Sequence, residues 1–94
     1  MNETQVILVR FWAAARAAAG TDAVEVRLPA PVTLADLRSD LVRRHAGPDP
    51  QRLADVLGVC SVLFGDRPAG TADPAQIVVP VGVGVEFLPP FAGG

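Results

Sequence analysis

Residues 23–45 read AVEVRLPAPVTLADLRSDLVRRH, and within this stretch the apolar spacing changes from that of a strand to that of a helix. Residues 23–28 alternate apolar and charged side chains, which predicts a half-buried strand with Val24, Val26 and Leu28 facing inward. Residues 34–45 carry leucines at helical spacing and predict an amphipathic helix. Thr33 is its expected N-cap, with Asp36 three residues later as in a capping box. A strand followed by one amphipathic helix is therefore the centre of the predicted fold.

Further strands and short helices flank this centre. Residues 5–12 (QVILVRFW) form a β-rich apolar run that would pair antiparallel with residues 23–28 and bury Ile7, Val9 and Phe11 on one face. Residues 13–19 have a helix-forming composition, and Gly20 stops them. Downstream, the patterns predict a short helix at 51–57, stopped by Gly58, and strands at 59–64, 76–79 and 85–88.

The order strand, strand, helix, strands predicts an α+β fold in which one main helix packs on a mixed sheet of four to five strands. This is the order of a ubiquitin-like β-grasp. The 94 residues suit a single domain, residues 1–94. Residues 89–94 are expected to form an extended, flexible C-terminal tail.

The composition excludes several classes of function. One cysteine rules out an internal disulfide and multi-cysteine metal sites, and one histidine rules out sites that need two. The net charge of −2, without a basic cluster, argues against nucleic acid. No apolar run approaches the ~20 residues of a membrane span. Glu3, Arg10 and Arg16 argue against a signal peptide. We therefore expect a cytoplasmic protein that uses neither nucleic acid nor a membrane.

Most of the residues with reactive side chains have a structural interpretation. Cys60 lies in a strand pattern and is expected to be a small buried hydrophobe, and His45 stands near a predicted helix C-terminus, where a cation suits the helix dipole. Asp36 and Asp40 are placed on the exposed side of the helix, with Asp40 and Arg44 as a favourable i, i+4 pair. Gly82 and Gly84 do not match a phosphate-binding loop.

The C-terminal residues carry the strongest functional signal. Pro89 and Pro90 end the last strand and lead the chain away from the domain in an extended form. Phe91 and Ala92 follow, and a bulky apolar residue on an exposed arm indicates contact with a partner. Two residues without side chains, Gly93 and Gly94, would let the arm enter a narrow channel.

The ending FLPPFAGG, residues 87–94, closely resembles the C-terminus of the MoaD-type sulfur carriers, the small subunits of molybdopterin synthase in the MoaD/ThiS ubiquitin-like family. Residues 9–20 (VRFWAAARAAAG) look like the family's aromatic-Ala-x-x-Arg-x-x-x-Gly element, and residues 33–37 (TLADL) resemble its helix start. Residues 62–69 (VLFGDRPA) look like the strand and turn where the family often has Val-Asn-Gly. Phe64 stands at the usual Asn position and Val83 where an acidic turn residue is frequent.

The resemblance implies that Gly94 carries the chemistry and that Gly93 gives access to it. An E1-like adenylating enzyme would consume ATP to activate the Gly94 carboxylate, and a persulfide donor would convert it to a thiocarboxylate. The charged arm would then donate sulfur to a pterin precursor held by the large synthase subunit, in a heterotetramer. Pro89, Pro90, Phe91 and Ala92 would position the arm against partners, with Phe11 or Trp12 as a further contact. The small subunit would bind no cofactor and would not be catalytic alone.

Three alternatives remain open from the sequence. The chain could carry sulfur for thiamin, cysteine or tRNA thiolation. It could be a protein modifier joined through Gly94 to lysines of targets, although all eight of its basic residues are arginines and it cannot form lysine-linked chains. It could also be an interaction domain with an incidental diglycine.

Overall fold

The computed structural model describes residues 3–45 and 47–90. The predicted strand at the N-terminus is β1 (Thr4–Phe11), and it pairs antiparallel with β2 (Ala23–Pro29). Between them lies α1 (Ala13–Ala19), which ends at Gly20 with φ +75°, a left-handed conformation that glycine adopts without strain. The first third of the chain therefore folds as its residue pattern predicts.

The central helix α2 (Leu34–His45) has the predicted bounds and the predicted cap. The Asp36 backbone N–H donates to Thr33 Oγ1 at 3.0 Å, and the Thr33 N–H donates to Asp36 Oδ2 at 3.2 Å. These two bonds satisfy N–H groups that have no partner within the helix. The capping box is confirmed.

The second half contains α3 (Pro50–Val59), β3 (Ser61–Phe64), β4 (Arg67–Pro68), the 3-10 turn η1 (Pro74–Gln76) and β5 (Val85–Leu88). Three predictions here are wrong. The strand predicted at 59–64 begins only at Ser61, because Val59 is the last residue of α3 and Cys60 is its C-cap. Gly58 lies inside α3 and does not stop it, since its φ is not left-handed. Residues 76–79 form no strand, only a bridge between Thr33 and Val78, because Asp73 caps the turn η1 with a bond from the Ala75 N–H at 3.0 Å.

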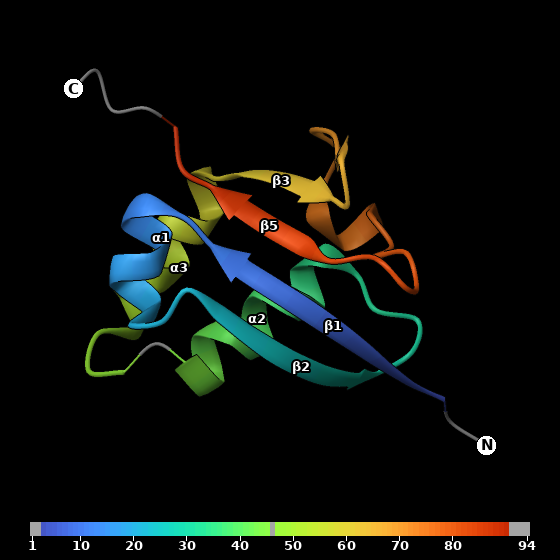
Figure 1. The fold of residues 1–94 in the computed structure, drawn as a ribbon, viewed down its shortest axis with the longest axis horizontal. Coiled ribbons are helices and arrows are strands. Elements are labelled where there is room, and N and C mark those ends of the chain that lie inside the picture. Colours follow the sequence, from blue (N-terminus) through green and yellow to red (C-terminus); the bar gives the residue numbers. More distant parts are fainter. Residues whose placement is uncertain (1–2, 46, 91–94) are drawn as a thin grey trace.

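The strands form one mixed sheet in the order β2-β1-β5-β3-β4, with β1 and β5 parallel and the other pairs antiparallel. Figure 1 shows the sheet in front with α2 and α3 behind it and α1 beside the end of β1. The long helices pack on one another, and α1 packs on α3. The predicted main helix is therefore α2, joined by two others in a compact α+β fold.

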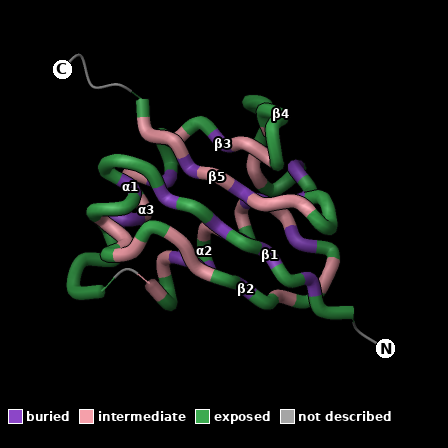
Figure 2. Tube along the Cα trace, in the orientation of Figure 1, coloured by how far each residue is buried: buried purple, intermediate pink, exposed green. Residues whose placement is uncertain are grey.

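The core lies between the sheet and the helices, where apolar side chains repeat along each element. Figure 2 shows buried positions alternating with exposed ones along β1. The fully buried large side chains are Ile7, Val9, Phe11, Val32, Leu34, Leu37, Leu41, Leu53, Leu57, Val79, Val85 and Phe87. This core fixes β5 between its two neighbours, and so fixes the point at which the C-terminal residues begin.

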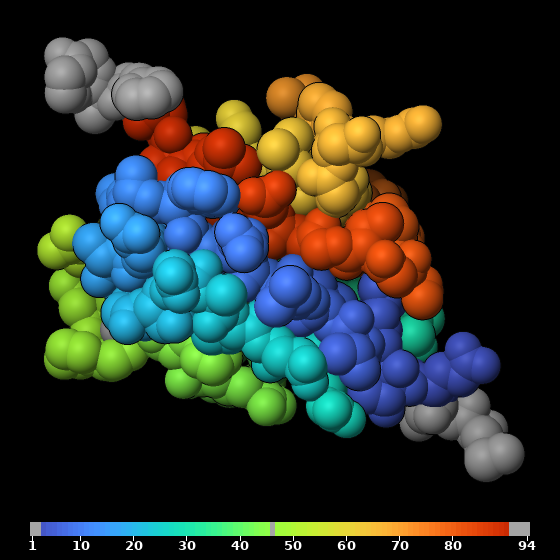
Figure 3. Space-filling view, viewed as in Figure 1, coloured from blue at the N-terminus to red at the C-terminus, as the bar shows by residue number. Residues whose placement is uncertain are grey.

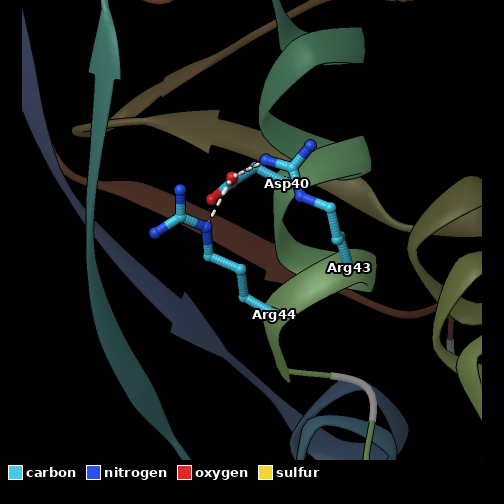
Figure 4. A network of polar contacts seen from close by, with 3 residues as sticks. All are labelled: Asp40, Arg43 and Arg44. Atoms are coloured by element: carbon cyan, nitrogen blue, oxygen red, sulfur yellow. Dashed lines mark hydrogen bonds and ion pairs between the residues drawn. The ribbon is translucent and has the colours of Figure 1, made fainter.

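Asp40 is expected on the exposed side of α2, and this prediction is wrong because its side chain is only 2% exposed. The position follows Leu37 by three residues, so it lies at the border of the buried helix face. Figure 4 shows Arg43 and Arg44 on either side of it, with Arg43 Nη2 at 2.7 Å and Arg44 Nε at 2.8 Å from Oδ1. The predicted pair with Arg44 is confirmed, while Arg43 adds a second donor that keeps the buried carboxylate paired.

Candidate functional site

The candidate site begins at β5, which holds the base of the C-terminal segment. Val85 and Phe87 are fully buried, and the ring of Phe87 stacks on that of Phe11 with centroids 6.1 Å apart and planes 20° apart. Hydrogen-bonded neighbours lie on both sides of the strand. The segment that follows Leu88 therefore starts from a rigid base.

Trp12 ties the end of β1 to this base by two contacts. Its backbone N–H donates to the carbonyl oxygen of Phe87 at 3.2 Å, and its indole Nε1 donates to Glu86 Oε1 at 2.9 Å. Trp12 as a whole stays 44% exposed. The predicted partner contact by Phe11 is wrong because Phe11 belongs to the core, whereas Trp12 offers an apolar surface beside the tail.

The next residue, Ala13, has φ +48°, an uncommon conformation for a residue with a Cβ. It lets the chain turn directly from β1 into α1 while Trp12 keeps its bond to β5. A short turn with backbone strain thus stands next to the base of the tail.

The outer face of the sheet beside this base is apolar with charges interspersed. Val6 and Leu8 are about half exposed, and Arg10 is paired in register with Glu86 across the β1–β5 ladder. Figure 3 shows β1 in blue and β5 in red side by side on the face turned toward the reader. A shallow cavity of about 300 Å³ lies there, lined by Leu8, Arg10, Gly65, Gly84, Val85 and Glu86. This face could receive a partner that engages the tail.

The structure places only part of the predicted tail. Pro89 is half-buried and Pro90 is exposed, directly after β5. Phe91, Ala92, Gly93 and Gly94 lie outside the described residues. Their proposed roles therefore remain predictions.

Cys60 differs from its prediction in place, since it is the C-cap of α3 and not part of a strand, but its role is structural as expected. It is half-buried between α3 and β3, and its Sγ donates to the Val56 carbonyl oxygen at 3.2 Å. Burial raises the pKa of the Cys60 thiol to about 11, while the charge of Arg38 opposes this rise. The thiol is therefore protonated, and a poor nucleophile, near pH 7.

The other candidates contribute no reactive group. His45 is the last residue of α2, and Asp36 is committed to the helix cap. Gly82 has φ +84° in the turn before β5, so it serves that turn. Within residues 3–45 and 47–90, no three His, Cys, Asp or Glu residues are grouped as metal ligands. No helix in that same part of the chain is long and apolar enough to cross a bilayer.

Sequence reasoning missed Glu86 as a site residue. Its partner Trp12 is 74 positions away, so no local pattern indicates the hydrogen bond. Only the parallel pairing of β1 with β5 brings the two side chains together.

The order of elements, the mixed five-stranded sheet and the helices on one face define a ubiquitin-like β-grasp fold. Several solved structures share this fold. The putative molybdopterin converting factor subunit 1 of Pyrococcus furiosus is 19% identical, with a TM-score of 0.71 over 92% of this chain and 98% of that chain. Small archaeal modifier protein 1 of Haloferax volcanii is 20% identical, with a TM-score of 0.68 over 92% and 98%.

A third similar structure is a complex of subunits 1 and 2 of the molybdopterin-converting factor of Helicobacter pylori. The matching chain is 21% identical, with a TM-score of 0.59 over 95% of this chain and 99% of that one. No family model matches the sequence, and no curated protein matches it. At these identities the likeness establishes the fold alone.

Proposed function

We propose that this chain is a sulfur carrier of molybdenum cofactor biosynthesis that works through its Gly94 carboxylate. The observation that carries the proposal is the position of Pro89, directly after the buried central strand β5. A reactive group at Gly94 would thus extend on a short arm from a rigid base. The shared fold with converting-factor subunit 1 supports this proposal.

The arm would be charged in two chemical stages. A carboxylate is a poor electrophile, so an E1-like enzyme would join it to the α-phosphate of ATP, releasing pyrophosphate and leaving an acyl-adenylate. The terminal sulfur of a persulfide would attack the carbonyl carbon and displace AMP. A second thiol would then cleave the remaining S–S bond, forming a disulfide with the donor and releasing the Gly94 thiocarboxylate.

The thiocarboxylate sulfur is soft and ionised at neutral pH, so it would act as the nucleophile toward a pterin precursor. Hydrolysis would return the carboxylate after each transfer, and two charged carriers would be consumed for each dithiolene. ATP would be used by the activating enzyme, and this chain would bind no cofactor.

The described residues would supply the base and the surface that a partner recognises. Trp12 presents apolar area near the end of β5, Leu8 extends this surface toward the start of β5, and Arg10 and Glu86 add polar contacts. Phe91, Ala92 and Gly93 would enter the partner's channel with Gly94. The Helicobacter pylori neighbour binds a second subunit, and we propose that a corresponding large subunit binds here, in a heterotetramer in the cytoplasm.

The second candidate is a protein modifier, favoured by the shared fold with small archaeal modifier protein 1. In that case the activated Gly94 would form an amide with a lysine of a target protein. A carrier for thiamin, cysteine or tRNA thiolation shares the first steps and differs only in the acceptor.

The test is the intact mass of the chain after incubation with an adenylating enzyme, ATP and a persulfide source. We expect a gain equal to the replacement of one oxygen by sulfur. The variant lacking Gly94, and a chain with one alanine added after Gly94, should show no gain. No gain in the original chain, while a control carrier is charged in the same mixture, would contradict the proposal.

The acceptor separates the candidates once the chain is charged. Formation of molybdopterin from the pterin precursor with the large subunit supports the pathway proposed here. Adducts of this chain that survive denaturation and contain an isopeptide bond to a target lysine would instead support the modifier function.

A further inference from the structure

A cavity of about 380 Å³ lies away from the tail, between α2, β3 and the loop that precedes η1. Leu34 and Arg38 line it from α2, Cys60 and Ser61 from the start of β3, and Thr71 and Ile77 from the far side. Its volume falls in the range of small-molecule sites. Nothing in the sulfur-carrier proposal uses these residues.

Among the described residues that line the cavity, Arg38 is the one that carries a charge. Its Nε is shielded from solvent and has no hydrogen-bond partner among residues 3–45 and 47–90, and no carboxylate of that part of the chain forms an ion pair with it. Burial lowers the pKa of the Arg38 guanidinium, although an arginine remains charged at neutral pH. Arg38 is half-buried, and its shielded Nε lacks a partner, so an anion in the cavity could accept a hydrogen bond from this nitrogen and pair with the guanidinium charge.

The neighbouring acidic residues do not supply this partner. On the same helix, Asp36 accepts the cap bond from Thr33, and Asp40 pairs with Arg43 and Arg44. Asp73 accepts a hydrogen bond from the Ala75 N–H in η1. The Cys60 thiol is protonated near pH 7, because burial raises its pKa to about 11, so it does not offset the charge of Arg38.

The residues that line the cavity indicate which kind of anion it could bind. Leu34, Val62 and Ile77 are buried aliphatic residues, and they offer apolar surface to a hydrocarbon group. A guanidinium matches the two oxygens of a carboxylate, and the hydroxyls of Ser61 and Thr71 provide further donors. A phosphate dianion would call for a second cation, which the described lining residues lack.

We propose that this cavity binds a small aliphatic monocarboxylate, with the carboxylate paired to Arg38 and the hydrocarbon part against Leu34 and Ile77. The site is separate from the chemistry proposed at Gly94. Its occupancy would stabilise the folded chain, and the free energy of unfolding would rise with the logarithm of ligand concentration above Kd.

The experiment is an NMR titration of the full, ¹⁵N-labelled chain with 4-methylpentanoate. Saturable shifts are expected at the amides of Cys60, Ser61 and Thr71. The uncharged 4-methylpentanamide should bind about tenfold more weakly or worse, since it loses the charge-assisted hydrogen bonds. Equal affinity for the amide, tighter binding of inorganic phosphate, or no saturable shift would each overturn the proposal.

Two variants locate the binding. Arg38→Gln should lower the affinity for 4-methylpentanoate about tenfold or more. Arg52→Gln, at an exposed position of α3, should leave that affinity unchanged. If Arg38→Gln fails to fold, Ala72→Trp tests the same cavity from an exposed loop position and should also block binding. Unchanged affinity in a folded Arg38→Gln or Ala72→Trp chain would place the ligand elsewhere.

Discussion

Trp12 Nε1 donates a hydrogen bond to Glu86 Oε1 at 2.9 Å, joining the residue after β1 to the strand that leads into the C-terminal segment. The two residues are far apart in the chain and meet only because β1 and β5 are parallel neighbours. The bond holds a part-exposed indole against Glu86 of β5. A partner that engages the tail would therefore meet Trp12 in a fixed position.

This bond should be measurable as a coupling between the two residues. Trp12→Phe keeps an aromatic ring but removes the donor, and Glu86→Ala removes the acceptor. Because both side chains reach solvent, we expect a coupling of about 0.5 kcal/mol in the free energy of unfolding. Denaturant unfolding of the two single variants and the double variant gives this value, and additive effects would show that the bond is absent in solution.

Replacing Asp40 should lower the free energy of unfolding more than replacing an exposed acidic residue. Its side chain is 2% exposed, but Arg43 and Arg44 are 69% and 55% exposed and can return to solvent when the carboxylate is lost. Asp40→Ala should therefore lower the free energy of unfolding by about 1–2 kcal/mol, less than the loss of one partner of a fully buried pair. Asp55→Ala, at an exposed position of α3, is the control and should stay within about 0.5 kcal/mol. Equal effects would contradict the burial of Asp40.

The Cys60 thiol should make stability fall at alkaline pH. Its pKa is raised by burial to about 11 from an ordinary 9.0, so between these values the unfolded chain has lost a proton that the folded chain keeps. The free energy of unfolding is then highest below pH 9 and decreases as pH rises toward 11. The chain has no lysine or tyrosine to titrate in this window.

The control for this prediction is Cys60→Ala, measured by denaturant unfolding at several pH values. The variant should lose most of the slope between pH 9 and 11. A slope that persists in Cys60→Ala would assign the pH dependence to another group.

Local signals explain which elements the sequence predicted well. The alternation in β1 and β2, the capping box at Thr33 and the helical spacing of α2 all depend on residues within a few positions of one another. Burial of Asp40 and the continuation of α3 through Gly58 depend on tertiary packing instead, which overrides weak local preferences. The Trp12–Glu86 contact has no sequence signal at all, and the roles of Gly93 and Gly94 rest on resemblance.

A matched pair of leucines tests the core. Leu37 is fully buried on α2, and Leu8 is 53% exposed on the sheet. Leu37→Ala should lower the free energy of unfolding by about 2–5 kcal/mol, since it removes buried apolar surface and leaves a cavity. Leu8→Ala should cost about 1 kcal/mol or less. Similar losses for the two variants would mean that α2 does not bury the Leu37 face.

The position at which α3 ends can be tested by replacing Gly58 and Gly20 with alanine. The two substitutions should change the free energy of unfolding in opposite directions. A Cβ added at Gly58 or at Gly20 would meet no atom within 4 Å, so the new methyl group would neither clash nor gain a contact at either site. Gly58 lies in a helix, and Gly58→Ala should raise the free energy of unfolding by about 0.5–1 kcal/mol. Gly20 has φ +75°, and Gly20→Ala should lower it by about 1 kcal/mol, because a Cβ strains that conformation. Denaturant unfolding of both variants measures the difference, and a loss of stability in Gly58→Ala would show that α3 ends before Gly58.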